Sequence, residues 1–544
     1  MRKPAIPVSA MVFVVITGFL SASLSSMAGE LTEDTTWSGT VVLDSNVVVP
    51  AGIVLTIEPA TTVQMKNAVT IYIYGRLLAD GTEAQPIRFT RYASGMTWKQ
   101  IRFVEAADSR LTNCIFEYAN CVGDHKDYYD NDCNSATLPL PRTYHEAVVG
   151  LASHVDFEKC VFRNLPSAGG AGDAIAIISD DLYHTGSASA NFRSCQFLSI
   201  GQGIHTRFAY VLVEDCYFVG KTGDNDDVDL YGESPPGFPP CLVRRNLFDY
   251  PPCEDDRIHP TLCSAIITEN VIKGSTDHGI VLRDKSTPIV TNNVIYNCSS
   301  GGITVQNQCD ALLVNNTIVN CGRGIRFFDH TDRWGPPYCL SPGSGKATVI
   351  NCIIWDCPTS FELQDSPYTQ DRGSHVIVKY CDVKGGQSQM SVSAHSTVTW
   401  GAGNINVDPQ FVNAGSKDYH LKSQAGHWNP GTQTWVPDTV HSPCIDTGDP
   451  NDPNYSDWTA ELWPNGERIN MGAYGGTSQA SMSPSSAGNI ADLNHDDIVD
   501  WRDFADFSNT WEANKSLLAE DLDRNAIVDP NDLLIFTENW LWQQ

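Results

Sequence analysis

The chain has 544 residues, a formal net charge of −29 at pH 7 and a sequence pI near 4.7. A balance this acidic argues against a general nucleic-acid-binding protein, because nucleic acids are themselves polyanions. A length of 544 residues is large for one globular core but ordinary for a solenoid, in which each repeat packs only on its neighbours.

The first residues have the pattern of a secretory signal peptide, which we predict for residues 1–28. Arg2 and Lys3 precede an apolar run from Met11 to Leu20, and Ser26-Met27-Ala28 is a small-x-small cleavage sequence. The apolar run is too short to cross a bilayer comfortably, and no other stretch of the sequence is a transmembrane candidate. We therefore expect a secreted or cell-surface protein with no membrane span once the signal is removed.

Two short patterns alternate between Ser264 and Asp329. The first, Asn-x-Ile or Asn-x-Val, occurs at Asn270, Asn293 and Asn316, and the second, Gly-Ile, occurs at Gly279, Gly302 and Gly324. Both return at nearly the same interval, in the low twenties. A period of this size, rich in β-branched residues and marked by Gly, Asn and Asp, indicates a solenoid of short strands.

The Asn pattern extends in both directions if Cys is allowed at the same position. An inward turn position accepts either Asn, which bonds to adjacent coils, or a small buried thiol. We call the ten positions the turn column: Cys114, Cys160, Cys195, Cys216, Asn246, Asn270, Asn293, Asn316, Cys352 and Cys381. This pattern resembles the right-handed parallel β-helix proteins of the pectate-lyase-like superfamily, and the resemblance implies an all-β solenoid over most of the chain.

The expected domain plan follows from the ends of this pattern. Alternating strands from Trp37 to Phe103 resemble entry coils, and motifs up to Tyr474 resemble closing segments that cap the solenoid. We expect the β-helix with its caps to span residues 29–476, followed by a Ser/Pro-rich linker at 477–488 and a small all-α module at 489–544.

The chain has 17 cysteines, an odd number that leaves at least one thiol without an intramolecular partner. Turn-column cysteines suit buried thiols, as do Cys298, Cys321 and Cys357 in a second column. Disulfide candidates are Cys121 with Cys133, and a pairing among Cys241, Cys253 and Cys263, although spacing alone does not fix connectivity.

A motif occurs twice near the C-terminus, beginning at Asp492 and again at Asp521. Each copy places oxygen ligands at positions 1, 3, 5, 9 and 12, with an apolar residue at position 7 that supplies its carbonyl, as in an EF-hand-type calcium loop. The predicted ligands are Asp492, Asn494, Asp496, Ile498, Asp500 and Asp503 in the first loop, and Asp521, Asp523, Asn525, Ile527, Asp529 and Asp532 in the second.

The pair of loops resembles a type I dockerin module. The resemblance implies two bound calcium ions, helices after the loops, and a cohesin-like protein partner for residues 489–544. Two residues depart from the pattern: position 6, normally Gly, is Asp497 in one loop and Ala526 in the other.

Alignment of the Gly-Ile strands predicts which side chains face outward, because strand residues alternate between the two faces. It places several basic residues on one face of this acidic chain, with Asp277 beside them. We predict His278, Arg283 and Lys285 as the base or the neutralising cation, and His205, Arg207, Arg323, Arg326 and Asp277 as substrate contacts.

Such a face suits an acidic polysaccharide, because Arg and His bind carboxylates and a base next to them can remove an α-proton in a β-elimination. We rank hydrolysis below elimination, since clustered aspartates on adjacent coils are missing from the alignment. A further calcium ion is possible near Asp224, Asp226, Asp227 and Asp229. Two alternatives stay open: a non-catalytic glycan-binding or surface-structural β-helix, and an adhesion protein. In either alternative, the basic residues of the predicted face are solvated side chains paired with nearby carboxylates.

Overall fold

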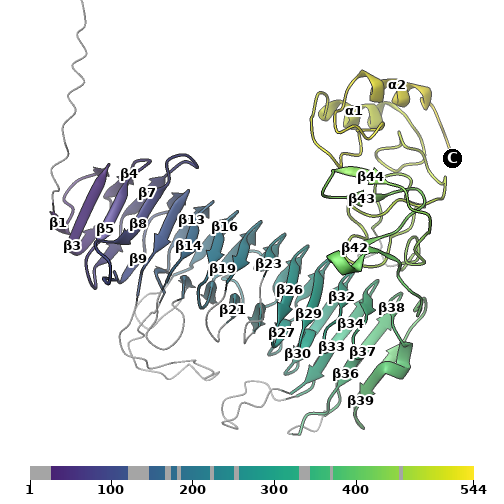
Figure 1. Ribbon diagram of the computed structural model, residues 1–544, viewed down its shortest axis with the longest axis horizontal. Coiled ribbons are helices and arrows are strands. Elements are labelled where there is room, and N and C mark those ends of the chain that lie inside the picture. Colours follow the sequence, from purple (N-terminus) through teal and green to yellow (C-terminus); the bar gives the residue numbers. More distant parts are fainter. Residues whose placement is uncertain are drawn as a thin grey trace, which may run out of the picture.

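The computed structural model describes residues 26–120, 146–165, 173–179, 186–220, 226–249, 256–329, 343–367, 372–451 and 457–544. Parallel strands stack along the long axis of the molecule, in one 26-stranded and one 14-stranded sheet (Figure 1). The smaller sheet forms the first face of each coil, and the larger sheet forms the second and third faces. The all-β parallel β-helix predicted from the sequence is confirmed.

The first face comprises β2 (Thr35–Trp37), β4 (Val54–Ile57), β7 (Arg76–Asp80), β10 (Ser109–Thr112), β13 (His154–Glu158), β16 (Ser189–Arg193), β19 (Tyr210–Glu214), β22 (Leu242–Arg244), β25 (Ile266–Thr268), β28 (Ile289–Thr291), β31 (Asp310–Val314), β34 (Lys346–Ile350), β37 (His375–Lys379) and β40 (Thr397–Trp400). The second comprises β1 (Ser26–Glu30), β3 (Thr40–Val49), β5 (Thr62–Met65), β8 (Ile87–Arg91), β11 (Cys114–Glu117), β14 (Val161–Arg163), β17 (Gln196–Leu198), β20 (Tyr217–Val219), β23 (Leu247–Asp249), β26 (Val271–Ser275), β29 (Val294–Cys298), β32 (Thr317–Val319), β35 (Ile353–Trp355) and β38 (Asp382–Val383). The third, which carries the candidate site, comprises β6 (Thr70–Ile73), β9 (Gln100–Val104), β12 (Val148–Leu151), β15 (Ile175–Ile178), β18 (Ile204–Arg207), β21 (Val228–Tyr231), β24 (Ile258–Thr261), β27 (His278–Leu282), β30 (Gly301–Gln306), β33 (Arg323–Phe328), β36 (Thr359–Leu363) and β39 (Met390–Val392).

The turn column stacks in register as the sequence predicts. Residues two positions after each of its members pair from coil to coil, from Phe116 with Phe162 through to Ile354 with Val383. Asn246, Asn270 and Asn293 each donate a side-chain hydrogen bond of 2.9 or 3.0 Å to the side-chain oxygen of the next Asn. A buried amide is satisfied there because its neighbour is an identical amide one coil away.

Aromatic rings stack directly behind the cysteine part of this column. Phe116, Phe162, Phe197, Phe218 and Phe248 are buried, and their ring centroids lie 4.6–5.1 Å apart between successive coils. Offset stacking of large apolar rings supplies both burial and a defined register. The thiols beside them are small enough to leave room for the rings.

Every cysteine in the described ranges is a buried free thiol. Cys298, Cys321 and Cys357 stack in the second column, as predicted, whereas a bridge between Cys241 and Cys263 is not formed, so that expectation is wrong. Both occupy inward positions on successive coils, where a thiol packs as a small apolar group. Cys121, Cys133 and Cys253 lie outside the described residues.

The parallel strands end at Trp400 rather than continuing toward Tyr474. A short turn of helix at Gly386–Gln389 comes just before the last two of these strands, β39 and β40. After them the chain forms two antiparallel pairs, β41 (Phe411–Asn413) with β42 (Asp418–Leu421) and β43 (His427–Asn429) with β44 (Thr434–Val436), with a second short turn of helix at Ala414–Ser416.

This closing segment folds back along the side of the solenoid instead of covering only its end. Asn292 donates hydrogen bonds to the carbonyls of Ala473 and Gly475, and Asn315 donates to that of Asn470. Outward apolar residues of the coils, including Tyr296 and Ile353, pack on Phe411, Tyr419, Leu421 and Met471.

Residues 477–488, expected to be a linker, are packed against the closing segment. Ser481 and Met482 are buried, and the amide of Met482 bonds to the carbonyl of Gly426. Small Ser and Ala side chains allow this close approach. Beyond them lie two helices, α1 (Trp501–Asn509) and α2 (Pro530–Glu538), as the sequence predicts for its C-terminal module (Figure 1). None of the helices described is long and apolar enough to cross a bilayer.

We expect Asn293→Ala to destabilise the solenoid. Its side chain accepts from the backbone and side chain of Asn270 and donates to Ile267, Thr291 and Asn316, so removal leaves buried polar groups unpaired. We predict a loss of roughly 3 kcal/mol, measured by urea denaturation. Asn293→Lys should prevent soluble expression altogether, because it places a charge between coils. Exposed Gln424→Ala is the control, and equal stability of Asn293→Ala and this control would contradict the column's role.

Candidate functional site

The candidate site lies on the third face, and its register differs from the predicted one. The structure aligns Ile175, Ile204, Val228, Ile258, Ile280, Ile303 and Ile325 on successive coils. The sequence alignment omits Val228 and Ile258, because neither follows Gly. Their spacing from the turn column is a usable signal, since Val228 follows Cys216 at the same interval as Ile258 follows Asn246.

The two omitted coils supply the acidic half of the site. Asp229 and His259 occupy the same outward strand position as His205, on the next two coils. Asp226 and Asp256 lie two residues before the aligned Val or Ile of their coils, the position that His278 holds on its own coil. We call the resulting set the Asp–His column: His205, Asp226, Asp229, Asp256, His259, Asp277 and His278. The sequence prediction found its three outer members, His205, Asp277 and His278, as site residues.

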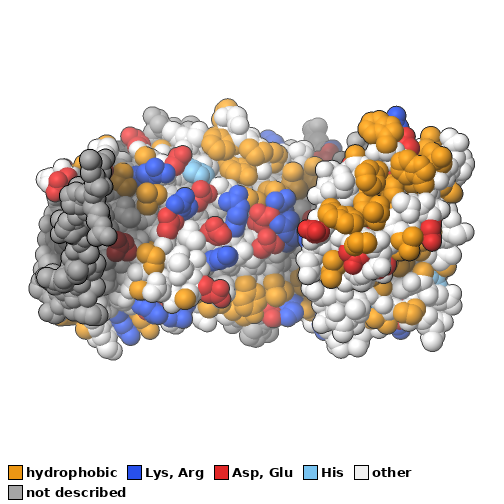
Figure 2. Space-filling model, turned by 90° about the horizontal axis from the view of Figure 1, so that it is seen from above, with side chains coloured by type: hydrophobic (Ala, Val, Ile, Leu, Met, Phe, Trp, Pro, Cys, Tyr) orange, Lys and Arg blue, Asp and Glu red, His pale blue; other side chains and the backbone are white. Residues whose placement is uncertain are grey.

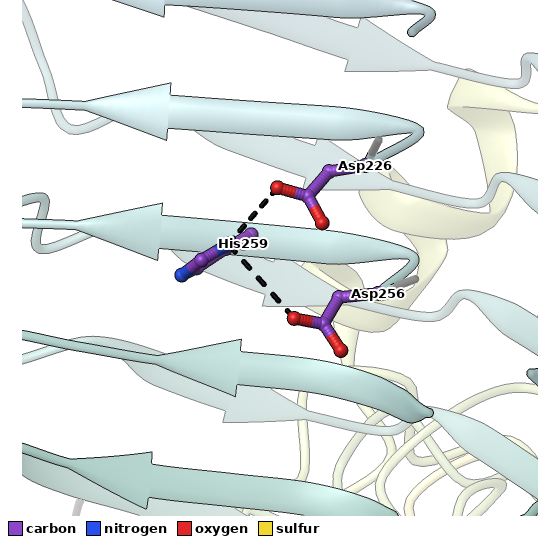
Figure 3. A group of neighbouring side chains, drawn as sticks. All are labelled: Asp226, Asp256 and His259. Carbon is purple, nitrogen blue, oxygen red and sulfur yellow. Dashed lines mark hydrogen bonds and ion pairs between the residues drawn. The ribbon is translucent and has the colours of Figure 1, made fainter. Parts of the chain in front are cut away.

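Carboxylates and imidazoles alternate within the Asp–His column. His205 Nδ1 lies 2.9 Å from Asp229 Oδ2, and His278 Nδ1 lies 3.0 Å from oxygens of both Asp256 and Asp277. Between these pairs, His259 Nδ1 lies 2.9 Å from Asp226 Oδ2 and 3.9 Å from Asp256 Oδ2 (Figure 3). Each imidazole therefore bonds to a carboxylate on a neighbouring coil, and His259 and His278 also approach a second carboxylate on their own coil.

The carboxylates keep these histidines protonated. Burial lowers the pKa of His259, but Asp226 outweighs it and raises that pKa to about 10. Burial likewise opposes the raised pKa values of His205 and His278, both about 9, which Asp229 and Asp256 produce. Burial raises the pKa of Asp226 although His259 opposes this shift. At neutral pH the site holds three imidazolium cations among carboxylates.

Several buried polar atoms on this face have no hydrogen-bond partner within the described part of the chain. They are Asp226 Oδ1, His259 Nε2, His278 Nε2, Thr304 Oγ1 and Gln306 Oε1. Buried polar groups are nearly always paired, and exceptions gather at functional sites. Their concentration beside the Asp–His column indicates that this face has hydrogen-bonding capacity for a ligand.

A buried arginine supports the column from behind. Arg257 is 1% exposed; it donates to Asp227 Oδ2 at 2.9 Å and, through two of its nitrogens, to the carbonyl of Gly274. It thereby ties together three coils beside Asp226 and Asp256. Such a planar, multiply bonded guanidinium holds neighbouring backbone in one geometry.

The predicted basic residues are only partly brought together. Arg323 and Arg326 both bond to Glu362 Oε2, at 2.9 and 2.7 Å, and His278 and Phe328 have ring centroids 6.4 Å apart. Arg326 lies over Phe328, 4.1 Å from the ring centroid. These residues form one end of the site. Because Arg323 and Arg326 both pair with Glu362, they also fit the alternative in which the basic side chains only balance nearby carboxylates.

Two of the predicted catalytic residues, Arg283 and Lys285, lie at the edge of the third face, beyond the end of β27. Arg283 follows β27, with its Nε 3.5 Å from Asp284 Oδ2. Lys285 is exposed in the following turn, and no contact in the described chain joins it to the Asp–His column. The strand ends at Leu282, so the alternation that was used to place both side chains no longer applies.

The expectation that paired aspartates are missing is wrong. Asp226 and Asp256 stand on adjacent coils, and with His259 they offer ligand atoms within 4.8 Å of one another. The pair escaped the alignment because both coils lack the Gly-Ile pattern. The further calcium ion stays a prediction: Asp224 lies outside the described residues, while Asp226, Asp227 and Asp229 each face a different cationic side chain.

The C-terminal module brings three of the six predicted ligands in each loop close together. Asp492, Asp496 and Asp503 offer oxygens within 4.8 Å of one another, as do Asp521, Asp523 and Asp532. Asp497 and Ala526, at the position normally held by Gly, adopt φ of 65° and 71°. The turn that the motif requires is therefore formed without Gly, at some cost in strain.

The loops also have the electrostatics of a cation site. Burial raises the pKa of Asp492, and the charge of Asp503 adds to the shift; the pKa of Asp521 is raised in the same way, with Asp532 adding to it. The helices pack through matched aromatics, with the Phe507 and Phe536 centroids 5.5 Å apart. Converging oxygen donors under mutual repulsion fit a calcium ion.

Comparisons with known proteins bear on the fold. A family model described as "Right handed beta helix region" matches residues 148–334, and one described as "Disaggregatase related" matches residues 366–448. No curated protein is significantly similar to this chain.

Among solved structures, a double mutant of the periplasmic alginate epimerase AlgG is 13% identical, with 68% of this chain and 77% of that chain covered at a TM-score of 0.38. The unmutated AlgG structure is 12% identical over 66% of this chain and 76% of that one, at a TM-score of 0.33. A structure titled glycoside hydrolase is 12% identical over 61% of this chain and 50% of that one, at a TM-score of 0.18. At such TM-scores these likenesses carry no argument about activity.

The shifted histidines predict a pH dependence of stability. Because the folded pKa values, about 9 to 10, lie above the ordinary value, their contribution is complete below about pH 6.5. It is lost as pH rises through 9 to 10. We expect His259→Gln to be less stable than the wild type at pH 6.5 and to lose less stability between pH 6.5 and 10. Thermal unfolding with exposed His395→Gln as control checks this, and parallel pH curves for His259→Gln and wild type would contradict it.

Calcium should stabilise the C-terminal module, because the cation relieves repulsion among the loop carboxylates. We expect calorimetric titration of the purified chain to detect two ions bound by these loops. Replacing Asp492 and Asp521 by Ala should remove both ions, while exposed Asp506→Asn, which lies outside the loops, should remove none. Equal binding by the double variant and wild type would rule out these loops as the sites.

Proposed function

We propose that this chain is a secreted, carbohydrate-active β-helix protein that binds an acidic polysaccharide at the Asp–His column and cleaves it by elimination. The observation that carries the proposal is the set of buried polar atoms around His259 and His278 that lack a partner in the described chain. A saccharide offers many hydroxyl groups for such atoms, and its carboxylates suit imidazolium and guanidinium cations.

The chemistry assigned to the site has two parts. Imidazolium cations and Arg326 neutralise the carboxylate of a uronate residue, which makes its α-proton more acidic. A base then removes that proton, a carbon–carbon double bond forms, and the bond to the glycosidic oxygen breaks with proton transfer to the leaving oxygen. Since the histidine pKa values are about 9 to 10, a histidine acting as this base becomes effective only toward alkaline pH.

Glycoside hydrolysis is a second candidate, favoured by the pair Asp226 and Asp256. Two carboxyl groups on neighbouring coils are the chemical requirement for that reaction, with one group protonated as the acid. Burial raises the pKa of Asp226, which suits it to the acid role. This reaction would weaken as pH rises, so its pH dependence is opposite to that of elimination.

The C-terminal module is proposed to be a dockerin-like, calcium-dependent docking module with a cohesin-like partner. Exposed large hydrophobic residues are concentrated in it: Trp501, Phe504, Trp511, Ile527, Leu534, Trp540 and Leu541. Figure 2 shows hydrophobic side chains gathered over the C-terminal part of the chain, in contrast to the mixed charges along the solenoid. A surface of this kind supports association with another protein. Secretion is proposed from the signal pattern at residues 1–28.

The test is a panel of uronate-containing and neutral glycans, with binding measured by calorimetry at two salt concentrations. We expect selective binding of an acidic glycan that weakens as salt rises, because the contacts are ionic. Arg326→Ala should weaken binding roughly tenfold. Arg110→Ala is the matched control, since Arg110 is an exposed, ion-paired arginine on another face.

Products identify the reaction. Elimination yields an unsaturated sugar that absorbs ultraviolet light, at a rate that rises toward pH 9 and falls in His259→Gln and His278→Gln. Hydrolysis yields reducing ends without this absorbance and favours lower pH. Binding with neither product supports the non-catalytic alternative, and salt-independent binding of a neutral glycan, unaffected by Arg326→Ala, would refute the acidic site.

A further inference from the structure

A small aromatic surface lies on the same strands as one end of the Asp–His column. Arg207 on β18 pairs in register with Tyr231 on β21, and His205 pairs with Asp229 two residues earlier. Since strand side chains alternate, both pairs face outward on the same side, about 7 Å apart along the strand. Phe208 follows Arg207 at the turn and is 37% exposed. We call Arg207, Phe208 and Tyr231 the aromatic platform.

The three side chains contact one another. The ring centroids of Phe208 and Tyr231 lie 5.7 Å apart with the rings nearly perpendicular, and Arg207 Cζ lies 5.9 and 5.7 Å from these centroids. A guanidinium next to two rings is held in a narrow range of orientations. The platform is therefore preorganised, with an apolar surface beside a cation.

A glycine allows the Phe208 ring to occupy its position. Gly232 holds the same turn position one coil further on, and a Cβ there would collide with Phe208 Cδ1. In neighbouring coils the corresponding residues are Ala152, Ser179 and Leu262. Among these neighbouring coils the exposed aromatic ring is thus particular to the coil of β18, the strand that also carries His205.

The ring has no structural role comparable to that of the inward aromatics. Phe162, Phe197 and Phe218 stack in the buried core, whereas Phe208 leaves more than a third of its surface in water. Exposing an apolar ring costs free energy that core packing does not recover. A ligand that covers the ring would recover it.

We propose that the aromatic platform is a subsite for the sugar residue next to the one held at the Asp–His column. This inference rests on the proposed function. A pyranose ring presents an apolar C–H face that can stack on the exposed ring of Phe208, with Tyr231 standing nearly perpendicular at its side, and the Arg207 guanidinium adds a positive charge that attracts the carboxylate of a uronate. The platform would then fix the direction in which an acidic glycan lies across the site.

Binding of uronate oligosaccharides of increasing length to the purified chain tests the subsite. We expect Phe208→Ala and Tyr231→Ala each to weaken binding of chains long enough to span both positions roughly tenfold. Phe208→Leu should weaken it as well, because it keeps apolar volume but lacks a flat ring. Phe238→Ala is the matched control, since Phe238 is 38% exposed and stacks on Tyr210, at 5.7 Å between centroids.

The outcomes separate the subsite from the function on which it rests. Wild-type affinity that rises with chain length and falls in the platform variants supports the subsite, provided that thermal unfolding shows the variants folded. Unchanged affinity in those variants, with loss in Arg326→Ala, overturns the subsite alone. Failure of the wild type to bind any acidic oligosaccharide overturns both.

Discussion

The molecule depends on in-register stacking of parallel strands, which places equivalent residues of successive coils one strand spacing apart. Any residue type that is stable beside a copy of itself is then suited to a buried column. Asn293 satisfies Asn270 by the same bonds that Asn316 supplies to Asn293, and Phe162 stacks on Phe116 and Phe197 alike. Coil spacing thus converts one local interaction into a continuous core.

The same rule explains what the sequence could and could not predict. Inward positions are restricted to apolar, Cys or Asn residues, so all ten turn-column residues were found in the sequence, and the residues two positions after them pair in register. Outward positions have no such restriction, and their register depends on turn lengths. Asp256 and His259 were missed for that reason, and Asp226 was named only as a possible calcium ligand: the strands that follow Asp226 and Asp256 keep the same interval from the turn column, but neither carries the Gly-Ile pattern on which the alignment relied.

The closing segment shows a second limit, set by contacts between residues distant in sequence. Its motifs were recognisable as a terminal element, but nothing local in them indicated that Asn292 and Asn315 would bond to the backbone of Ala473 and Asn470. The outward apolar residues Tyr296 and Ile353 were a usable signal. An apolar residue that points away from a solenoid core needs another cover, and the closing segment provides it.

Stacking also has a cost at the candidate site, because it brings carboxylates together as readily as amides. In a chain of net charge −29, Asp226 and Asp256 on adjacent coils repel each other, and no side chain can be inserted between coils to separate them. His259 offsets this repulsion from the outward face, where it reaches both, and His278 does the same for Asp256 and Asp277. The protons on His259 and His278 therefore help to hold these coils together. Under the proposed elimination the same histidines would exchange protons with a bound sugar, so a substitution of His259 is expected to change both the stability of this face and its chemistry.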